Sequence, residues 1–407
     1  MVELPPAPPR PAFWNIRPEA RLLVHCAHTH LDGAQSAAIR ALATEDIDWR
    51  WLFQQSWQHG ILPLVYRTLK SVCMDEVPET VINELREHSF ANAGRTVALS
   101  GELLRLLKLY EAQGIRVIPF KGPVLASVAY GNPALRMFTD LDILVHKEDV
   151  PRVCELLRAQ GYSSPQDRLA PRQMAAYRYF FNQHEFKHAR SFFSVEPHWE
   201  IAPIICASFN SLQLWQRAQP IPWKGYDILS LAPEDLLLVL CMHGGWHLFA
   251  RLAWICDIAE FMRVHPAIDF LRIMLEARRV GAERAFLLGI YLAQDVLGAP
   301  LPQEILQRVR IEPTVLDLAG QVESRLFLKP DSCATVSRKA LFYLRIRERW
   351  QDRALYILRA LTTPLATHFE KLPLRASAFF RYFLLPLWRV VKNVPDLLKT
   401  IAGWERR

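Results

Sequence analysis

Hydrophobic residues recur at the spacing of an α-helix toward both ends of the chain, and the period changes in the middle. Between residues 18 and 112, apolar positions such as Leu99 and Leu103 follow helical spacing, which predicts helices. The same spacing returns after Ala232-Pro233-Glu234-Asp235, a sequence typical of a helix start. We therefore predict helical regions over residues 18–112 and 231–407.

Short strands are predicted in the middle of the chain. Residues 115–120 form a brief apolar run, and residues 140–145 alternate aspartates with apolar side chains before ending in an apolar run. Between residues 177 and 199, apolar residues separated by polar ones predict two strands with a turn near residues 189–191. These patterns predict an α+β fold, in which a small mixed sheet over residues 113–230 is flanked by helices.

Composition limits the class of protein. The chain is 51% hydrophobic and 22% charged, as expected of a folded protein. Residues 1–17 are rich in proline and are predicted to form an extended lead-in without the features of a secretory signal. No apolar run is long enough for a transmembrane helix. The seven cysteines are scattered and lack a CxxC pair, which predicts reduced thiols and a cytoplasmic location.

Positive charge is concentrated at the C-terminal end. The net charge is +8, and residues 334–407 carry 15 Lys and Arg against 5 Asp and Glu. Within them, residues 376–404 mix aromatic side chains with Arg381, Arg389 and Lys392. Such a segment could contact an anionic membrane or RNA phosphates. We favour the alternative, in which the aromatic residues pack on the core and the bases stay in solvent.

Two aspartates are the strongest candidates for chemistry. Asp140 and Asp142 are two positions apart in a predicted strand, so both project to one face while Leu141 and Ile143 face the other. Two carboxylates held this close repel each other unless a cation lies between them. Oxygen ligands suit Mg²⁺ or Mn²⁺. The pair therefore predicts a metal site for phosphoryl or nucleotidyl transfer, and a solvated strand end is the alternative.

A turn suited to phosphate precedes these aspartates. Gly122 allows a tight turn, and Pro123 fits the first turn of the helix that follows. Free N–H groups at a helix N-terminus bind anions. Lys121 beside the turn and Arg136, four residues before Asp140, would add positive charge for the phosphates.

These motifs together resemble a known family. The Lys121-Gly122 turn, the sequence Tyr130-Gly131-Asn132-Pro133, Arg136 and the strand Asp140–Val145 are similar to those of the uncharacterised bacterial nucleotidyltransferase family. That family is a branch of the polymerase-β-like nucleotidyltransferase superfamily. The resemblance implies that two metal ions assist transfer of a nucleoside monophosphate from an NTP to an acceptor hydroxyl. In the wider superfamily the turn is usually Gly-Ser or Gly-Gly, whereas Pro123 has no N–H to offer a phosphate.

The resemblance also implies a third carboxylate on a neighbouring strand. An acidic-x-His-Trp element maps onto Glu196, His198 and Trp199, so Glu196 would be a metal ligand or the base that activates the acceptor. Pro197 predicts an edge strand or a strand end, and Glu200 is the reserve candidate. The alternative is an exposed strand with polar alternation.

Two histidines four residues apart, His243 and His247, have the spacing of a zinc site on a helix. The two glycines between them weaken that helix, and no Glu stands in the position of a general base, so we disfavour zinc. The family resemblance includes such a histidine and the pattern Arg251-x-x-Trp254-x-x-Asp257. We therefore predict that His198, His243 and Asp257 lie on the acceptor side of the site.

Three functions are compatible with these sequence features. The first is a nucleotidyltransferase whose partners are an NTP and an acceptor that is a small molecule, a peptide or RNA. The second is a non-catalytic nucleotide- or partner-binding module on the same fold. The third is a toxin-like, RNA-directed nucleotidyltransferase, which the basic C-terminal segment and the Lys-Gly turn favour.

Overall fold

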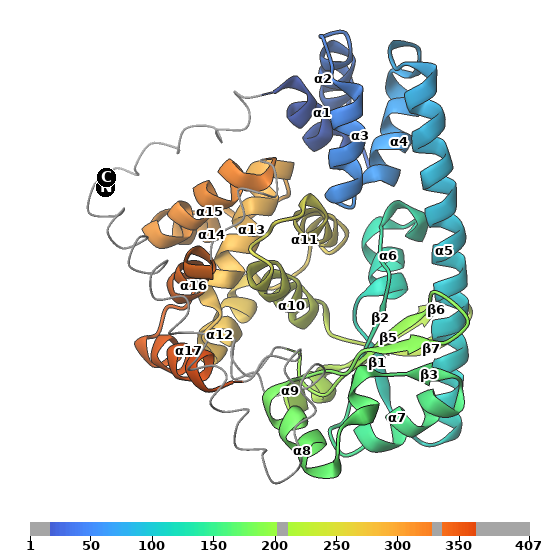
Figure 1. The fold of residues 1–407 in the computed structure, drawn as a ribbon. Coiled ribbons are helices and arrows are strands. Elements are labelled where there is room, and N and C mark those ends of the chain that lie inside the picture. The colour runs from blue at the N-terminus through green and yellow to red at the C-terminus, as the bar shows by residue number, and fades with distance from the viewer. Residues whose placement is uncertain (1–16, 202–210, 328–335, 364–407) are drawn as a thin grey trace.

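The computed structural model describes residues 17–201, 211–327 and 336–363, and it confirms the α+β fold (Figure 1). N-terminal helices, a small mixed sheet and C-terminal helices follow one another along the chain. Within the described residues, no helix has both the length and the apolar character needed to cross a membrane. The predicted lead-in up to residue 16 and the basic segment 376–404 lie outside the described residues.

The N-terminal region is helical, as predicted. It consists of α1 (Pro18–Cys26), α2 (Gly33–Ala43), α3 (Trp49–Gln58), α4 (Leu62–Val72) and α5 (Glu79–Ala112). The carboxylates of Asp32 and Asp48 accept hydrogen bonds from the first turns of α2 and α3, which fixes where these helices start. Gly114, with φ +67°, turns the chain out of α5, which runs beside both the other N-terminal helices and the sheet (Figure 1).

The sheet has five strands in the order β1-β2-β5-β4-β3. They are β1 (Val117–Pro119), β2 (Leu141–Val145), β3 (Tyr162–Ser163), β4 (Phe186–His188) and β5 (Ser194–His198). Strands β2 and β5 are parallel, and the other neighbours are antiparallel. The two strands expected within residues 177–199 are therefore confirmed as β4 and β5. Residues 177–180 are not strand, because they complete α8 (Pro171–Phe180).

Each face of the sheet packs on a different set of helices. Leu141, Ile143 and Val145 lie in a core with α5 and α7 (Val150–Ala159). Leu144, on the opposite face, belongs to the larger core. That core includes α6 (Gly122–Tyr130) and helices from both ends of the chain. The alternation of strand side chains thus places Asp142, two positions before Leu144, on the face that meets the C-terminal helices.

A second, two-stranded sheet was not expected from the sequence. After α9 (Ser211–Arg217), β6 (Gln219–Trp223) pairs with β7 (Tyr226–Ser230) through a turn in which Lys224 and Gly225 both have positive φ. Two consecutive residues with positive φ are typical of a type I′ hairpin. Two prolines in β6 hide the strand pattern, because proline disfavours strand interiors.

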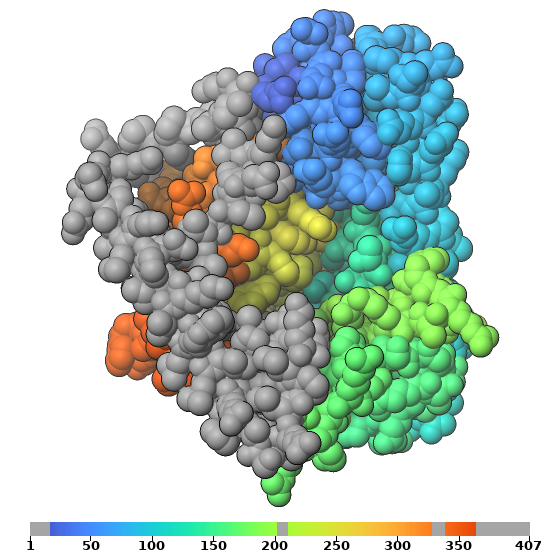
Figure 2. All heavy atoms as spheres, in the orientation of Figure 1, coloured from blue at the N-terminus to red at the C-terminus, as the bar shows by residue number. Residues whose placement is uncertain are grey.

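The described part of the C-terminal region is helical, as predicted. Its helices are α10 (Pro233–Trp246), α11 (Leu252–Val264), α12 (Phe270–Val280), α13 (Glu283–Leu297), α14 (Gln303–Arg310), α15 (Pro313–Leu326), α16 (Val336–Arg345) and α17 (Trp350–Thr362). One hydrophobic core joins α10, α11 and α13 to the N-terminal helices. In Figure 2, the yellow α10 and α11 lie between the blue N-terminal helices and the green sheet region.

Candidate active site

A cavity of about 430 Å³ lies where the sheet meets α10 and α11. Its walls come from the start of α6, the segment before β2, strands β2 and β5, and the facing sides of α10 and α11. The lining residues include most of the predicted site: Lys121, Gly122, Arg136, Asp140, Asp142, Glu196, His198 and His243. Sites of this size suit small-molecule ligands. The sheet thus supplies carboxylates to a cavity closed by the C-terminal helices.

The parallel pairing of β2 and β5 brings two of the predicted carboxylates together. Asp142 is the direct register partner of Glu196, and Leu144 is the partner of His198. Side chains at paired positions point to the same face of a sheet, so all of these side chains point away from α5 and α7. Ligand atoms of Asp142, Glu196 and His198 lie within 4.8 Å of one another. This is the spacing needed for ligands that share one metal ion.

Asp142 is buried and held by two positive or potentially positive groups. Lys121 Nζ lies 3.2 Å from its Oδ1 atom, and His198 Nε2 donates a hydrogen bond to the same oxygen at 3.0 Å. Burial favours the neutral acid, but the charge of Lys121 and the hydrogen bond from His198 hold the pKa of Asp142 well below its usual range. Asp142 is therefore a permanent carboxylate facing the cavity.

Asp140 lies immediately before β2 and behaves differently. Burial, together with the negative charges of Asp142 and Glu196, raises the pKa of Asp140 to about 7. The backbone of Asp140 packs closely against Gly122, which has φ +54°. A Cβ atom on Gly122 would lie only 3.1 Å from the carbonyl oxygen of Asp140. The turn before α6 and the aspartate segment are thus packed directly on each other. Asp140 is not part of the cluster formed by Asp142, Glu196 and His198.

Glu196 and His198 are oriented by their neighbours on β5 and the loop before β4. Gln183 Nε2 donates a hydrogen bond of 2.6 Å to Glu196 Oε2, and His198 Nε2 lies 3.7 Å from the same oxygen. Burial lowers the pKa of His198, but its hydrogen bond to Asp142 and the nearby carboxylate of Glu196 outweigh this and raise the pKa. Strand β5 is central rather than at an edge, and Pro197 is its next-to-last residue. The strand-end interpretation of Pro197 is therefore the correct one.

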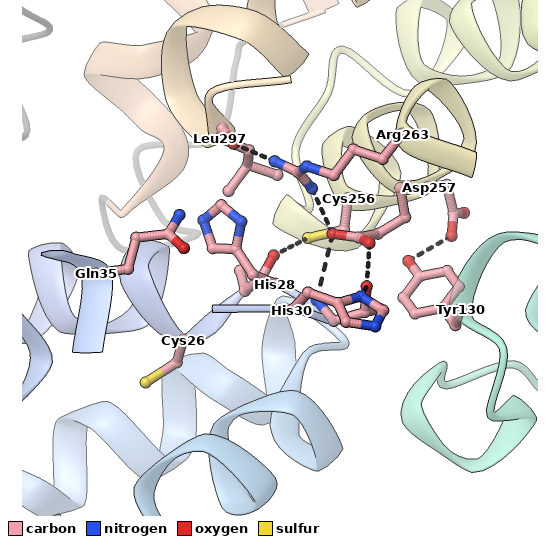
Figure 3. Close-up of polar contacts among 12 residues, drawn as sticks. Cys26, His28, His30, Gln35, Tyr130, Cys256, Asp257, Arg263 and Leu297 are labelled. Carbon is pink, nitrogen blue, oxygen red and sulfur yellow. Dashed lines mark hydrogen bonds and ion pairs between the residues drawn. The ribbon is translucent and has the colours of Figure 1, made fainter. Parts of the chain in front are cut away.

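Arg136 reaches the cavity as half of a buried ion pair. Its Nε and Nη2 atoms donate to the two carboxylate oxygens of Asp257 at 2.7 and 2.8 Å. Tyr130 Oη donates to the same carboxylate at 2.8 Å, and Figure 3 shows these two side chains pointing at each other. Burial opposes the charge on Arg136, but the Asp257 carboxylate more than offsets it and raises the pKa of Arg136. Only Nη1 has no hydrogen-bond partner among the described residues, so the predicted phosphate contact of Arg136 would depend on that atom.

Helix α11, which carries Asp257, is fixed from its other side. Glu260 accepts hydrogen bonds from the backbone and side chain of Thr29, in the segment after α1. Arg263 donates to the carbonyl of Leu297 at the end of α13. The thiol of Cys256 donates to the carbonyl of Ala27 at 3.7 Å. Figure 3 shows Cys256, Arg263 and Leu297 near Asp257. Together these contacts hold the position of Asp257, and hence of Arg136, relative to the sheet.

Helix α10 presents its two histidines to the cavity as neutral groups. Burial and the nearby Lys121 charge lower the pKa of His243 well below its usual value and that of His247 to about 4. The glycines do not break α10. Instead Gly244 admits the ring of Phe249, because a Cβ atom there would lie 2.1 Å from that ring. Among the described residues, the one group of three or more possible ligands close enough to share a metal ion contains Asp142, and neither of these histidines belongs to it.

The predicted site residues thus fall into two sets. Eight line the cavity, whereas Asp257 reaches it through Arg136, and Glu200 accepts a hydrogen bond from Ser211 and is not among the described lining residues. Reasoning from the sequence missed Gln183, which orients Glu196. A lone amide in a loop carries no pattern that could have identified it.

The donor set fits a divalent cation. Asp142 and Glu196 offer carboxylate oxygens at one register position. Asp140 adds a third carboxyl, whose pKa is raised by burial and by the negative charges of Asp142 and Glu196. Oxygen donors of this kind suit Mg²⁺ or Mn²⁺. A bound dication would supply the missing positive charge. His198 is close enough to be a ligand itself, but its Nε2 atom already donates to Asp142. We therefore assign His198 to orienting that ligand rather than to binding the metal.

Comparison with known proteins gives a separate result. A family model described as "uncharacterised nucleotidyltransferase" matches residues 45–298, more than half of the 407 residues. The matched range contains every residue that lines the cavity. No curated protein and no solved structure matches the chain.

Proposed function

The chain belongs to the family of uncharacterised nucleotidyltransferases, and we propose from this premise that it moves a nucleoside monophosphate from an NTP to an acceptor hydroxyl. Mg²⁺ or Mn²⁺ is the proposed cofactor. The observation that carries the proposal is the register of Asp142 with Glu196 across two parallel strands, beside the start of α6. This arrangement combines paired carboxylates with an anion-binding helix end in one cavity.

The chain's own residues have distinct proposed roles. Asp140, Asp142 and Glu196 hold the cations, and Gln183 and His198 orient two of these ligands through hydrogen bonds of 2.6 and 3.0 Å. When bound, the cations neutralise phosphate charge and lower the pKa of the acceptor hydroxyl. Glu196 is the candidate base for the proton of that hydroxyl.

The phosphate-binding role belongs to the turn before α6. The first N–H groups of a helix lack intrahelical partners, and α6 begins at Gly122 on the cavity wall. Pro123 contributes no N–H, so Lys121 becomes the main source of positive charge for the outgoing phosphates. Its ammonium is within 3.2 Å of Asp142 and would move from the carboxylate to the phosphates when a cation takes its place.

The test is transfer of label from each α-labelled NTP. The full-length protein is incubated with Mg²⁺ or Mn²⁺ and a small-molecule extract, with EDTA as the metal-free control. We expect labelled product from at least one NTP, none in EDTA, and none with Glu196→Gln. Asp227→Asn, an exposed acid on β7, is the matched control and should retain full transfer. Transfer that survives EDTA or Glu196→Gln would contradict the proposal.

A second candidate is a nucleotide-binding module without catalysis. The observation in its favour is the Lys121–Asp142 pair, because a lysine already neutralises the carboxylate that a metal would need. Such a module should bind an NTP equally well with or without Mg²⁺. Metal-dependent NTP affinity, measured by calorimetry, would exclude it. The RNA-directed alternative rests on the Lys121-Gly122 turn and on the basic residues 376–404, and the latter lie outside the described residues.

A further inference from the structure

A second cavity, of about 870 Å³, adjoins the candidate active site. Residues 136–139, just before Asp140, line both cavities, as do Trp246, Arg251 and Trp254 on the helical side. A molecule in the second cavity would therefore lie next to the carboxylates. The volume is in the range of pockets for small molecules.

Positive charge dominates the described walls of this second cavity. Besides Arg136, four cations line it: Arg95 of α5, Arg251 before α11, Arg325 of α15 and Lys339 of α16. None of these four forms an ion pair within the described parts of the chain. The single acid among the described lining residues is Asp257, which is already paired with Arg136. An anionic ligand would balance this charge.

The excess of positive charge in the second cavity is clearest at Arg325. It is half-buried on α15, and burial together with the nearby charge of Arg338 lowers its pKa. A guanidinium that loses water and faces another cation is stabilised by an anion, and its planar donors match a phosphate or carboxylate.

The remaining walls supply flat rings. Trp57, Trp246, Trp254 and Tyr343 line the second cavity, and Trp57 is 43% exposed. The rings of Trp246 and Tyr343 stack with centroids 5.2 Å apart, and Tyr343 Oη donates to the carbonyl of Trp246 at 2.7 Å. These contacts hold an aromatic surface in place, and such surfaces bind planar groups.

We propose that the second cavity binds the acceptor, and that the acceptor is a small anionic molecule with a planar ring, an acidic group such as phosphate, and a free hydroxyl. The assignment to the acceptor rests on the proposed function. The acceptor oxygen forms a bond to the α-phosphorus of the NTP, and the bond from that phosphorus to the oxygen bridging the β-phosphate breaks. Pyrophosphate leaves with the bond electrons, and the hydroxyl proton passes to Glu196 and then to solvent.

Binding of a matched pair of probes tests the cavity without turnover. The probes are 4-methylumbelliferyl phosphate and the neutral 4-methylumbelliferyl glucoside, whose ring is the same. Fluorescence anisotropy is measured with full-length protein in EDTA, so that no metal attracts phosphate to Asp142. We expect the phosphate probe to bind about tenfold more tightly than the glucoside, since a charge-assisted hydrogen bond to Arg325 is available only to the anion.

Variants locate the bound probe. Arg325→Gln and Lys339→Gln should each weaken the phosphate probe by up to about tenfold, and Lys339 is exposed, so its replacement leaves packing intact. Arg86→Gln, an exposed arginine on α5 that lines neither cavity, and Lys121→Gln should leave binding unchanged. Equal affinity for both probes, or sensitivity to Lys121→Gln alone, would overturn the inference.

The same experiment separates the two proposals. If the binding pattern holds and no labelled NTP is transferred, the proposed function fails while the anion-binding assignment of the second cavity is supported. If NTP is transferred but the phosphate probe shows no preference, the cavity inference fails and the proposed function is supported.

Discussion

The sheet holds a buried carboxylate in the candidate active site and α11 holds one beside it, and the two are held in different ways. On the sheet, Asp142 meets the single-point charge of Lys121 at 3.2 Å and shares its Oδ1 atom with His198. On α11, Asp257 accepts two parallel hydrogen bonds from Arg136 and a third from Tyr130. The first arrangement leaves a carboxylate that can exchange one cation for another. The second uses both oxygens and fixes the geometry.

This difference separates a chemical role from a positioning role. A lysine is a flexible point charge, whereas an arginine fork is planar and directional. Lys121 can therefore turn from Asp142 to a phosphate without disturbing the fold. Arg136 cannot leave Asp257 without leaving a buried charge unpaired. We therefore assign this pair mainly to holding α11 against the segment that precedes β2.

The largest expected effect is on stability at the α11 pair. Asp257→Asn should lower the free energy of unfolding by about 3–5 kcal/mol, because it leaves the Arg136 charge buried without a partner. Chemical denaturation measures this loss. The double variant Arg136→Met with Asp257→Leu should recover most of it, since neither charge then remains. If the single variant is as stable as the wild type, the pair does not hold α11 in place.

Replacing the sheet carboxylate, Asp142, should have the opposite effect: transfer is lost while the fold is retained. Asp142→Asn should reduce transfer by at least about a hundredfold, because changes even to groups that only orient metal ligands cost this much. The fold should persist, which far-UV circular dichroism can verify. Asp227→Asn on the exposed face of β7 is the control. Wild-type turnover in the Asn variant would show that Asp142 has no part in the chemistry.

Replacing Lys121 should have a smaller effect, on NTP binding and turnover, and it tests whether the cation beside Asp142 can bind phosphate instead. Lys121→Ala should weaken NTP binding by about tenfold and slow turnover together, because one charge-assisted contact to phosphate is lost. Lys121→Arg should rescue only in part, since a planar guanidinium does not replace a point charge. Calorimetry and turnover are measured for both variants, with the exposed Lys147→Gln as the control. Unchanged affinity in Lys121→Ala would leave the phosphates to the start of α6 and Arg136 Nη1.

A third buried carboxyl group, in α15, has neither a lysine nor an arginine partner among the residues that the structure describes. Burial and the neighbouring Asp295 raise the pKa of Glu323 to about 8. The unfolded chain releases this proton near pH 4.5 and the folded chain only near pH 8, so this group's contribution to stability falls as pH rises between those values. Glu323→Gln should flatten that slope and increase the free energy of unfolding at pH 8 by about 1 kcal/mol. An unchanged slope in urea titrations from pH 5 to 8 would contradict this.

The structural features that could be predicted from the sequence are those set by the local order of apolar and polar residues. Alternation along residues 140–145 places Leu141 and Ile143 in the core with α5 and α7, and the tight turn expected at Gly122 is present, with φ +54°. The hairpin of β6 and β7 escaped prediction because prolines mask its period. The family resemblance implied that Glu196 lies on a strand beside Asp142, but the shared register of the two residues was not predicted.

Contacts between distant parts of the chain could not be derived from pattern. Asp257 was predicted on the acceptor side, but its partner Arg136 lies 121 positions away, and no local periodicity links them. The same holds for His198, predicted beside the acceptor and found bonded to Asp142. Gln183 contacts Glu196 from a loop, where side-chain type alone carries no positional information.

Binding of Mn²⁺ to the purified full-length protein tests the central claim most directly. Electron paramagnetic resonance counts free and bound Mn²⁺ for the wild type, Asp142→Asn and Asp257→Asn under conditions in which all three are folded. The account predicts that Asp142→Asn loses Mn²⁺ binding and that Asp257→Asn keeps it, because only the sheet carboxylate is open to a new cation. Undiminished binding by Asp142→Asn, or loss confined to Asp257→Asn, would contradict it.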